Sequence, residues 1–269
     1  MRLIQHKKEA YWFYRFLSTG YDRWVNPLFW TPAMRSDALR GAQLDERTLE
    51  VLDAGAGTGF TTEGIVEAVD PDRVTMLDQS PHQLARAQRK PVLARVRKLL
   101  GDAEALPFET DRFDRYVSAG SIEYWPAPER GIAEAYRVLK PGGVALVAGP
   151  VPPGDRVLRW LAELWMLFPT EAQYREWFER AGFEDVAVTA VAPGWYRDPR
   201  SQYAVAVSGR KTVAGESPAT DAAGGAVEDV REPMGWRRRL VFAGRFVLGS
   251  LAGFVFVPVG AVLALRRRR

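Results

Sequence analysis

The stretch "VLDAGAGTGF", Val51 to Phe60, decides the fold of this 269-residue chain. It has the pattern of a buried strand, an acidic residue near its end, and a loop with glycines at alternating positions that opens a helix. Phe60 stands where a G-x-G-x-x-G dinucleotide loop has its last glycine, and the Gly-Lys-Ser/Thr of a Walker loop is missing. Instead, glycines at alternating positions let the backbone turn sharply and approach a ligand without Cβ atoms in the way.

Strand and helix patterns alternate on both sides of this loop. We expect strands at 49–53, 73–78, 96–102, 112–120 and 142–149, and helices at 58–69, from 81, and at 127–138. Two further helix patterns follow Pro150, and two strand patterns, "EDVAVTAVA" and "SQYAVAVSG", could complete the sheet. The alternation predicts right-handed crossovers and a doubly wound α/β domain with a mostly parallel sheet.

The composition excludes several kinds of site. The chain has no cysteine, which excludes disulfides, thiolate nucleophiles and cysteine-bound zinc. It has only two histidines, His6 and His82, so we expect no metal. The net charge of +4 comes largely from two arginine clusters, Arg237 to Arg239 and Arg266 to Arg269, so we expect no nucleic-acid partner.

Three acidic residues stand at the ends of successive strands. Asp53 precedes the glycines, and Asp78 and Asp102 end the next two strand patterns. Asp53 could face an ammonium group, Asp78 could accept hydrogen bonds from two ribose hydroxyls, and Asp102 could accept one from the exocyclic amine of adenine. Three carboxylates at one sheet edge fit a nucleoside that carries positive charge, such as S-adenosylmethionine. The simpler interpretation of the glycines alone is a tight strand-to-helix turn.

Together with "LKPGG" at 139–143, this series resembles the class I S-adenosylmethionine-dependent methyltransferases over residues 45–207. The resemblance implies a Rossmann-like, seven-stranded domain with S-adenosylmethionine as cofactor. The expected cofactor-binding residues are Asp53, Gly55, Gly57, Gly59, Asp78, Gln79, Asp102, Ala103 and Ser118.

A closer resemblance rests on stretches that the superfamily does not share. "IQHKKEAYWFYRFLS", "LDQSPHQLA", "GDAEALPF", "DRYVSAGSIEYWP" and "ELWMLFP" are similar to the 2-methyl-6-phytyl-1,4-benzoquinol methyltransferases of plastids, which serve tocopherol and plastoquinone synthesis. The resemblance implies methylation of a ring carbon of a prenylated benzoquinol in a membrane. The plastid proteins carry a transit peptide before this region, whereas this chain begins almost on it, which favours a prokaryotic relative whose catalytic domain faces the cytoplasm.

Two alternatives stay open at this point. The chain could methylate a menaquinone precursor, a sterol or another membrane lipid. It could also be a membrane adaptor that keeps the cofactor as a structural ligand without turnover.

Carbon methylation of a quinol needs an acceptor for a phenolic proton. The candidate catalytic residues are Glu123 and Tyr124, just past the fourth strand, and His82 near the cofactor, with His6 as a further acceptor. Glu123 and Tyr124 could instead be solvated residues of the sheet edge. His82 could be a surface residue, a helix cap or a wall beside the adenine.

The domain boundaries follow from composition. We expect an aromatic N-terminal helical arm (1–44), the methyltransferase domain (45–210), a flexible linker (211–235) and a C-terminal membrane anchor (236–269). The arm concentrates Tyr11, Trp12, Phe13 and Tyr14, which could fold over the cofactor or pack on the domain. The run 246–265 has no charge and, at about 1.5 Å per residue, could cover the roughly 30 Å of a bilayer core. The sequence leaves a homodimer open.

Overall fold

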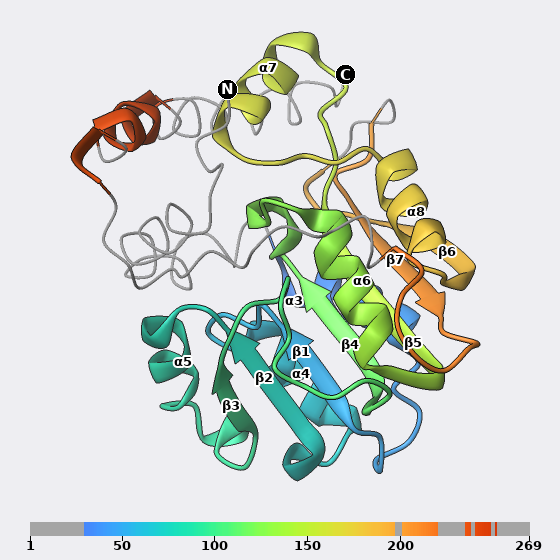
Figure 1. The fold of residues 1–269 in the computed structure, drawn as a ribbon. Coiled ribbons are helices and arrows are strands. Elements are labelled where there is room, and N and C mark those ends of the chain that lie inside the picture. The colour runs from blue at the N-terminus through green and yellow to red at the C-terminus, as the bar shows by residue number, and fades with distance from the viewer. Residues whose placement is uncertain (1–29, 197–200, 220–234, 238–239, 249–250, 252–269) are drawn as a thin grey trace.

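The computed structural model describes residues 30–196, 201–219, 235–237, 240–248 and 251. Within these ranges seven strands form one sheet in the order β3-β2-β1-β4-β5-β7-β6 (Figure 1). The first five are parallel, and β7 runs antiparallel between β5 and β6. The strands are β1 (Val51–Ala54), β2 (Val74–Asp78), β3 (Arg97–Leu100), β4 (Phe113–Ala119), β5 (Leu139–Pro150), β6 (Glu184–Val191) and β7 (Ala204–Arg210).

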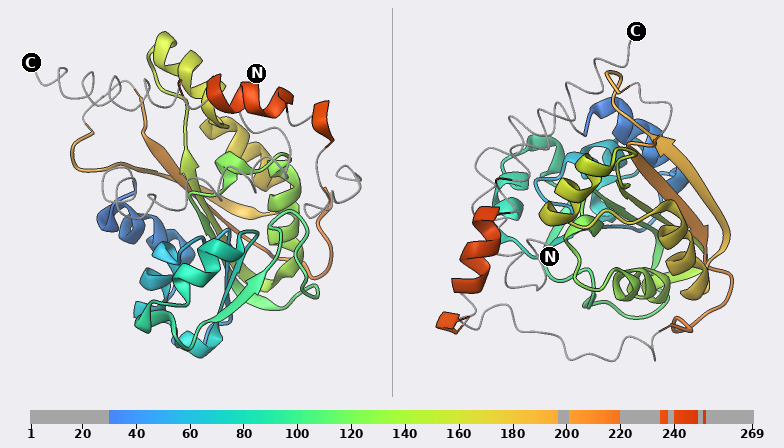
Figure 2. Two further views of the ribbon diagram at one scale, coloured as in Figure 1. Left: turned by 90° about the vertical axis from the view of Figure 1, so that its left-hand side faces the viewer. Right: turned by 90° about the horizontal axis from the view of Figure 1, so that it is seen from above.

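Helices cover both faces of the sheet, so the expected doubly wound domain is confirmed. Between residues 30 and 196 the α-helices are α3 (Pro32–Leu39), α4 (Phe60–Ala68), α5 (Pro81–Ala87), α6 (Pro128–Val138), α7 (Arg156–Trp165) and α8 (Glu171–Arg180). One apolar core lies under α6 and α8, and a second lies under α3, α4 and α5. Figure 2 shows the two layers from the side and from above.

Local sequence signals set the helix ends. Thr170 and Gln173 form a capping box at the start of α8, in which each side chain binds the other residue's backbone amide. The helix expected from Thr58 begins two residues later, at Phe60, because Gly57 and Gly59 have φ angles of +57° and +84°. The expected strand at 142–149 is longer than predicted and already begins at Leu139.

Residues 211–219, the first part of the expected linker, pack on the domain. Lys211 is fully buried, and its Nζ donates to Asp111 Oδ1 at 2.6 Å, Gly215 O at 2.7 Å and Arg137 O at 3.2 Å. Ser217 Oγ donates to a backbone oxygen of the domain at 2.9 Å. Among the small and polar residues of this stretch, Lys211 has a long side chain whose ammonium group forms its hydrogen bonds inside the domain. The rest of the expected linker, 220–234, lies outside the described residues.

Both expected ends of the chain fall largely outside the described residues. The aromatic cluster of the arm and His6 lie in 1–29, and most of the apolar run lies in 249–250 and 252–269. The described part of the arm contains α3 and a 3-10 turn, η2 (Arg40–Ala42), against the sheet. Across the described ranges, none of the helices combines the length and the apolar character needed to cross a bilayer.

Candidate active site

The glycine loop lies where the strand order reverses between β1 and β4, the place where open α/β sheets bind ligands. Gly55 (φ +70°) donates from its backbone amide to Leu77 O at 2.8 Å, which ties the loop to β2. A Cβ on Gly55 would lie 2.0 Å from Ser121 Oγ, so no larger residue fits there. A Cβ on Gly57 would meet no atom within 4 Å. The loop is therefore packed on its sheet side and open at Gly57.

Asp53 is a buried carboxyl group at the base of this loop. Its Oδ2 accepts a hydrogen bond from Thr62 Oγ1 at 2.6 Å, whereas Oδ1 has no partner among the described residues. Burial raises the pKa of Asp53 to about 7; the Thr62 hydrogen bond opposes this rise and the charge of Asp78 adds to it. A positively charged group beside Oδ1 would restore the ionised form.

Asp78 has a role that the sequence did not reveal. Its Oδ2 accepts from the backbone amide of Gly57 at 2.8 Å, and its Oδ1 accepts from that of Ser80 at 2.8 Å. Burial raises the pKa of Asp78 to about 6, although both hydrogen bonds oppose the rise. The carboxylate thus fixes the glycine loop to the end of β2 and, because each oxygen can accept a second bond, keeps capacity for a ligand.

The other expected cofactor residues lie on neighbouring strand ends. Asp102 is half-buried after β3, and its Oδ1 accepts from the backbone amide of Glu104 at 2.9 Å. Gln79 is half-buried directly after Asp78, and Ala103 is buried. Ser118 is fully buried in β4 on the sheet side of the loop, where its Oγ would lie 3.9 Å from a Cβ on Gly55.

Glu123 is a buried acid just after β4. It lies in η5 (Ile122–Tyr124), a 3-10 turn after β4, and its Oε2 has no hydrogen-bond partner in the part of the chain that the structure describes. Burial raises the pKa of Glu123 to about 7, and a hydrogen bond from its own backbone partly opposes the rise. The group is therefore suited to exchange a proton near neutral pH.

Sequence reasoning missed Tyr174, a residue of α8 whose hydroxyl is influenced by the charge of Glu123. Tyr174 is fully buried, and its hydroxyl donates to Pro150 O at 3.3 Å. Burial, together with the charge of Glu123, holds the pKa of Tyr174 well above its ordinary value, so it stays a neutral phenol. Its only signal in the sequence is the four-residue spacing to Phe178, the other buried residue of α8.

The remaining catalytic candidates differ in burial. Tyr124 is buried next to Glu123, whereas His82 is exposed in the first turn of α5. Among the described residues the structure shows no group of three or more His, Asp or Glu side chains arranged to hold a metal ion. Glu123 and Tyr124 are thus the buried candidates, and burial raises the pKa of Glu123 to about 7.

Comparisons with known proteins agree with this geometry. A methyltransferase domain family matches residues 51–143. The chain is 54% identical to the chloroplastic 2-methyl-6-phytyl-1,4-hydroquinone methyltransferase 2 of Oryza sativa subsp. japonica, over 96% of this chain and 74% of that protein. It is 32% identical to a ubiquinone/menaquinone biosynthesis C-methyltransferase of Methylobacterium nodulans, over 62% of this chain and 79% of that protein.

A solved structure shows the same fold. A SAM-dependent methyltransferase from Thermotoga maritima superposes with a TM-score of 0.59 and 20% identity, over 75% of this chain and all of that one (100%). At this identity the likeness concerns the arrangement of strands and helices. The similarity to the rice relative, in contrast, is a sequence identity that extends along nearly the whole chain.

Proposed function

Because the chain belongs to the 2-methyl-6-phytyl-1,4-hydroquinone methyltransferase family, we propose that it methylates a ring carbon of a prenylated benzoquinol, as in tocopherol and plastoquinone synthesis. The protein is an S-adenosylmethionine-dependent methyltransferase. The single observation that carries the choice of quinol is the high identity to the rice enzyme along almost the entire chain. The match to the ubiquinone/menaquinone enzyme is weaker and shorter, which places the menaquinone alternative second.

The residues at the sheet edge fit S-adenosylmethionine. Within the described ranges, Asp53 offers a buried oxygen without a hydrogen-bond partner, and Gly57 offers open space beside its α-carbon. We assign Asp53 to the ammonium end, Asp78 to the ribose and Asp102 to the adenine amine. When bound, the cofactor supplies an electrophilic methyl group on a sulfonium.

Glu123 is the proposed proton acceptor. A quinol ring already directs electron density to the carbon beside its hydroxyl group, and removal of the phenolic proton increases that density. Oε2 of Glu123 is free to accept this proton, and its raised pKa means that the carboxylate forms near neutral pH. The neutral hydroxyl of Tyr174, which donates to Pro150 O, keeps the wall beside this acid uncharged.

The C-terminal region is the proposed membrane anchor. Residues 246–265 carry no charge, and four arginines follow them. Tethering the enzyme to lipid would bring it to a quinol whose isoprenoid chain stays in the bilayer. In this proposal the tether begins after residue 219, since 211–219 belong to the domain.

The test uses the full chain with labelled S-adenosylmethionine and four acceptors: a prenylated benzoquinol, a demethylated menaquinol, a sterol and a phospholipid. We expect transfer to the benzoquinol. Transfer to the sterol or phospholipid alone would overturn the proposal, and cofactor binding without any turnover would favour the adaptor.

A further inference from the structure

Helix α7 presents an apolar face to solvent. Val157 is 65% exposed and Trp160 is 60% exposed, and their three-residue spacing places them on one side of the helix. Arg156 and Arg159 are exposed beside them. The opposite side of the helix is buried through Leu158 and Ala162. The helix thus buries one side and exposes large apolar groups on the other.

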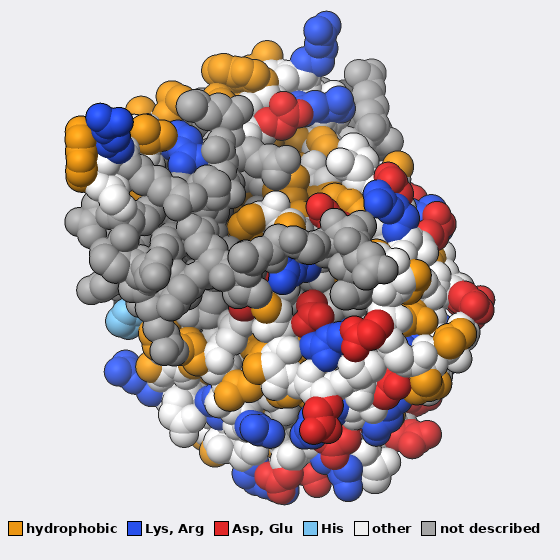
Figure 3. Space-filling model, viewed as in Figure 1, with side chains coloured by type: hydrophobic (Ala, Val, Ile, Leu, Met, Phe, Trp, Pro, Cys, Tyr) orange, Lys and Arg blue, Asp and Glu red, His pale blue; other side chains and the backbone are white. Residues whose placement is uncertain are grey.

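A second exposed apolar group belongs to the C-terminal helix, which comprises described residues 240–248, preceded by the helical pair 236–237. Its exposed apolar side chains, together with those of the flanking residues, are Trp236, Leu240, Val241, Val247, Leu248 and Leu251. Figures 1 and 2 show α7 and this helix at the same end of the molecule, beyond the carboxyl ends of the parallel strands. In Figure 3 hydrophobic side chains gather over both helices at this end, next to Lys and Arg side chains.

We propose that α7 is a second membrane contact, which inserts Val157 and Trp160 into the headgroup layer of an anionic bilayer. Apolar side chains gathered at one end of a protein indicate a binding surface, and tryptophan favours the membrane interface. Arg156 and Arg159 complement lipid phosphates. The chain itself identifies the partner as lipid, because in the sequence the residues that follow the described part of the C-terminal helix carry no charge up to 265.

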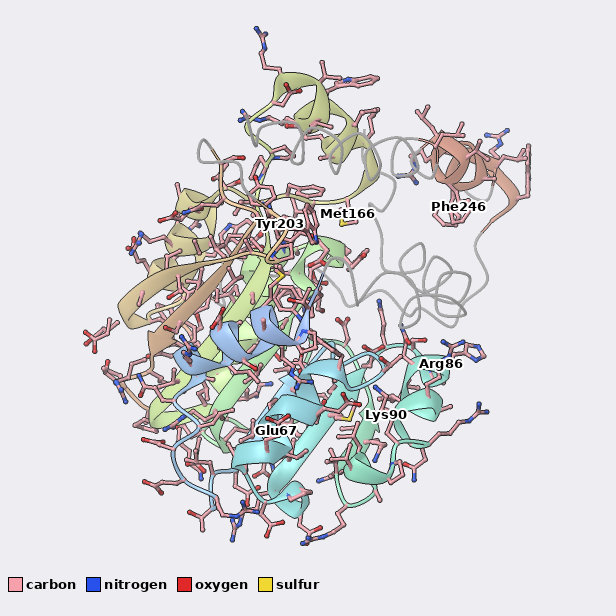
Figure 4. The ribbon with its side chains drawn as sticks, turned by 180° about the vertical axis from the view of Figure 1, so that it is seen from behind. Glu67, Arg86, Lys90, Met166, Tyr203 and Phe246 are labelled. Carbon is pink, nitrogen blue, oxygen red and sulfur yellow. The ribbon has the colours of Figure 1, made fainter. Side chains whose placement is uncertain are left out.

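The docked helix also leads to the active site. Two residues after α7 ends, the backbone amide of Leu167 donates to Glu123 O at 3.1 Å. Figure 4 shows Met166 where the chain leaves α7 toward the sheet. Insertion of α7 therefore places the proposed proton acceptor close to the lipid surface, so that a quinol can enter from the bilayer. This last step rests on the proposed function, whereas the membrane contact of α7 does not.

A single label tests the contact directly, because the chain has no cysteine. Val157→Cys takes an environment-sensitive fluorophore in the full chain bound to phosphatidylcholine–phosphatidylglycerol vesicles. Val213→Cys is the matched control, because Val213 has the same 65% exposure and lies in the segment after β7 at the opposite edge of the sheet. We expect emission to shift to shorter wavelength with vesicles at 157 only.

Three results would overturn the proposal. The first is no shift at 157 in vesicle-bound protein, and the second is an equal shift at 213. The third is a shift that appears without vesicles and grows with protein concentration, which would assign this face to a second copy of the chain.

Kinetics separate this inference from the proposed function. In the variant Val157→Ser/Trp160→Ser, we expect kcat/KM for a long-chain quinol in vesicles to fall at least about tenfold, since the apolar burial is lost. A short-chain, water-soluble quinol should be methylated within about twofold of the wild-type rate, because the active site is unchanged. Equal losses with both quinols would refute the role of α7. If the wild type methylates neither quinol, the proposed function fails while the labelling result stands.

Discussion

Replacing Asp53 by asparagine should stabilise the cofactor-free protein near neutral pH and weaken cofactor binding. Both effects follow from one cause. Asp53 is buried and its pKa is raised from 3.8 to about 7, so the folded state tolerates the charge poorly unless a cation is present. Asparagine keeps an oxygen for the hydrogen bond from Thr62 and removes the charge.

The size of the effect depends on pH in a defined way. The contribution of Asp53 to stability is full below its unfolded pKa of 3.8 and is lost as the pH rises through about 7. Between these values the unfolded chain has released the proton and the folded chain still holds it, so each pH unit lowers the free energy of unfolding by about 1.4 kcal/mol. From pH 5 to pH 7 the wild type should therefore lose about 2 kcal/mol relative to Asp53→Asn, which does not titrate, because the folded carboxyl is already half ionised at pH 7.

Denaturant titrations of the full chain at pH 5, 6 and 7, without cofactor, measure this difference. Asp45→Asn, at an exposed position, is the control and should show a nearly constant offset. Calorimetry with S-adenosylmethionine should show at least about a tenfold weaker affinity for Asp53→Asn. If the two titration series stay parallel, the burial argument is wrong. If affinity is unchanged, Asp53 does not face the cationic end of the cofactor.

Three further predictions address the other site acids and the domain boundary. Asp78→Ala should weaken cofactor binding by about 1–3 kcal/mol in calorimetry, because the Gly57 amide and the ribose lose their acceptor; unchanged affinity would contradict this. Glu123→Gln should lower kcat by about 10²–10⁴-fold while cofactor affinity is retained. The kcat of the wild type should rise with pH through about 7, because the carboxylate is the form that accepts a proton. A kcat that does not change with pH would show that Glu123 is not the proton acceptor. A chain that ends at residue 219 should bind cofactor. Compared with it, a chain that ends at 208, or one that carries Lys211→Met, should lose about 2 kcal/mol or more of unfolding free energy. Equal stability of all three chains would show that the buried lysine contributes little.

The strands and the glycine loop could be predicted from sequence because their signals are local. Every residue of β1 is buried, which produces the apolar run that ends at Ala54, and the positive φ angles of Gly55 and Gly57 require the residue type seen there. The bond between Asp78 and the Gly57 amide could not be predicted, because it depends on how β1 and β2 align in space.

Two other features also depend on distant parts of the chain. Tyr174 lies in a helix about fifty residues after Glu123, whose charge affects its pKa, so no spacing in the sequence links the two. Lys211 stands in a polar stretch, where a lysine is normally exposed. Its burial requires that Asp111 and two backbone oxygens lie within reach of one ammonium group, which only the folded chain brings about.

In the described part of the chain, charged side chains are paired at the amino ends of the strands, whereas two acids at the carboxyl ends are buried without a cation, and this difference affects stability. At the amino ends of the strands, charges are paired, as in Lys140–Asp114 at 2.9 Å and Lys211–Asp111 at 2.6 Å. At the carboxyl ends, Asp53 and Glu123 are buried with raised pKa values, and one oxygen of each has no hydrogen-bond partner among the described residues. Ionisation of Asp53 near neutral pH therefore destabilises the free protein, and a bound cation removes that cost. S-adenosylmethionine should consequently stabilise the protein more at pH 8 than at pH 6, beyond what its concentration alone explains.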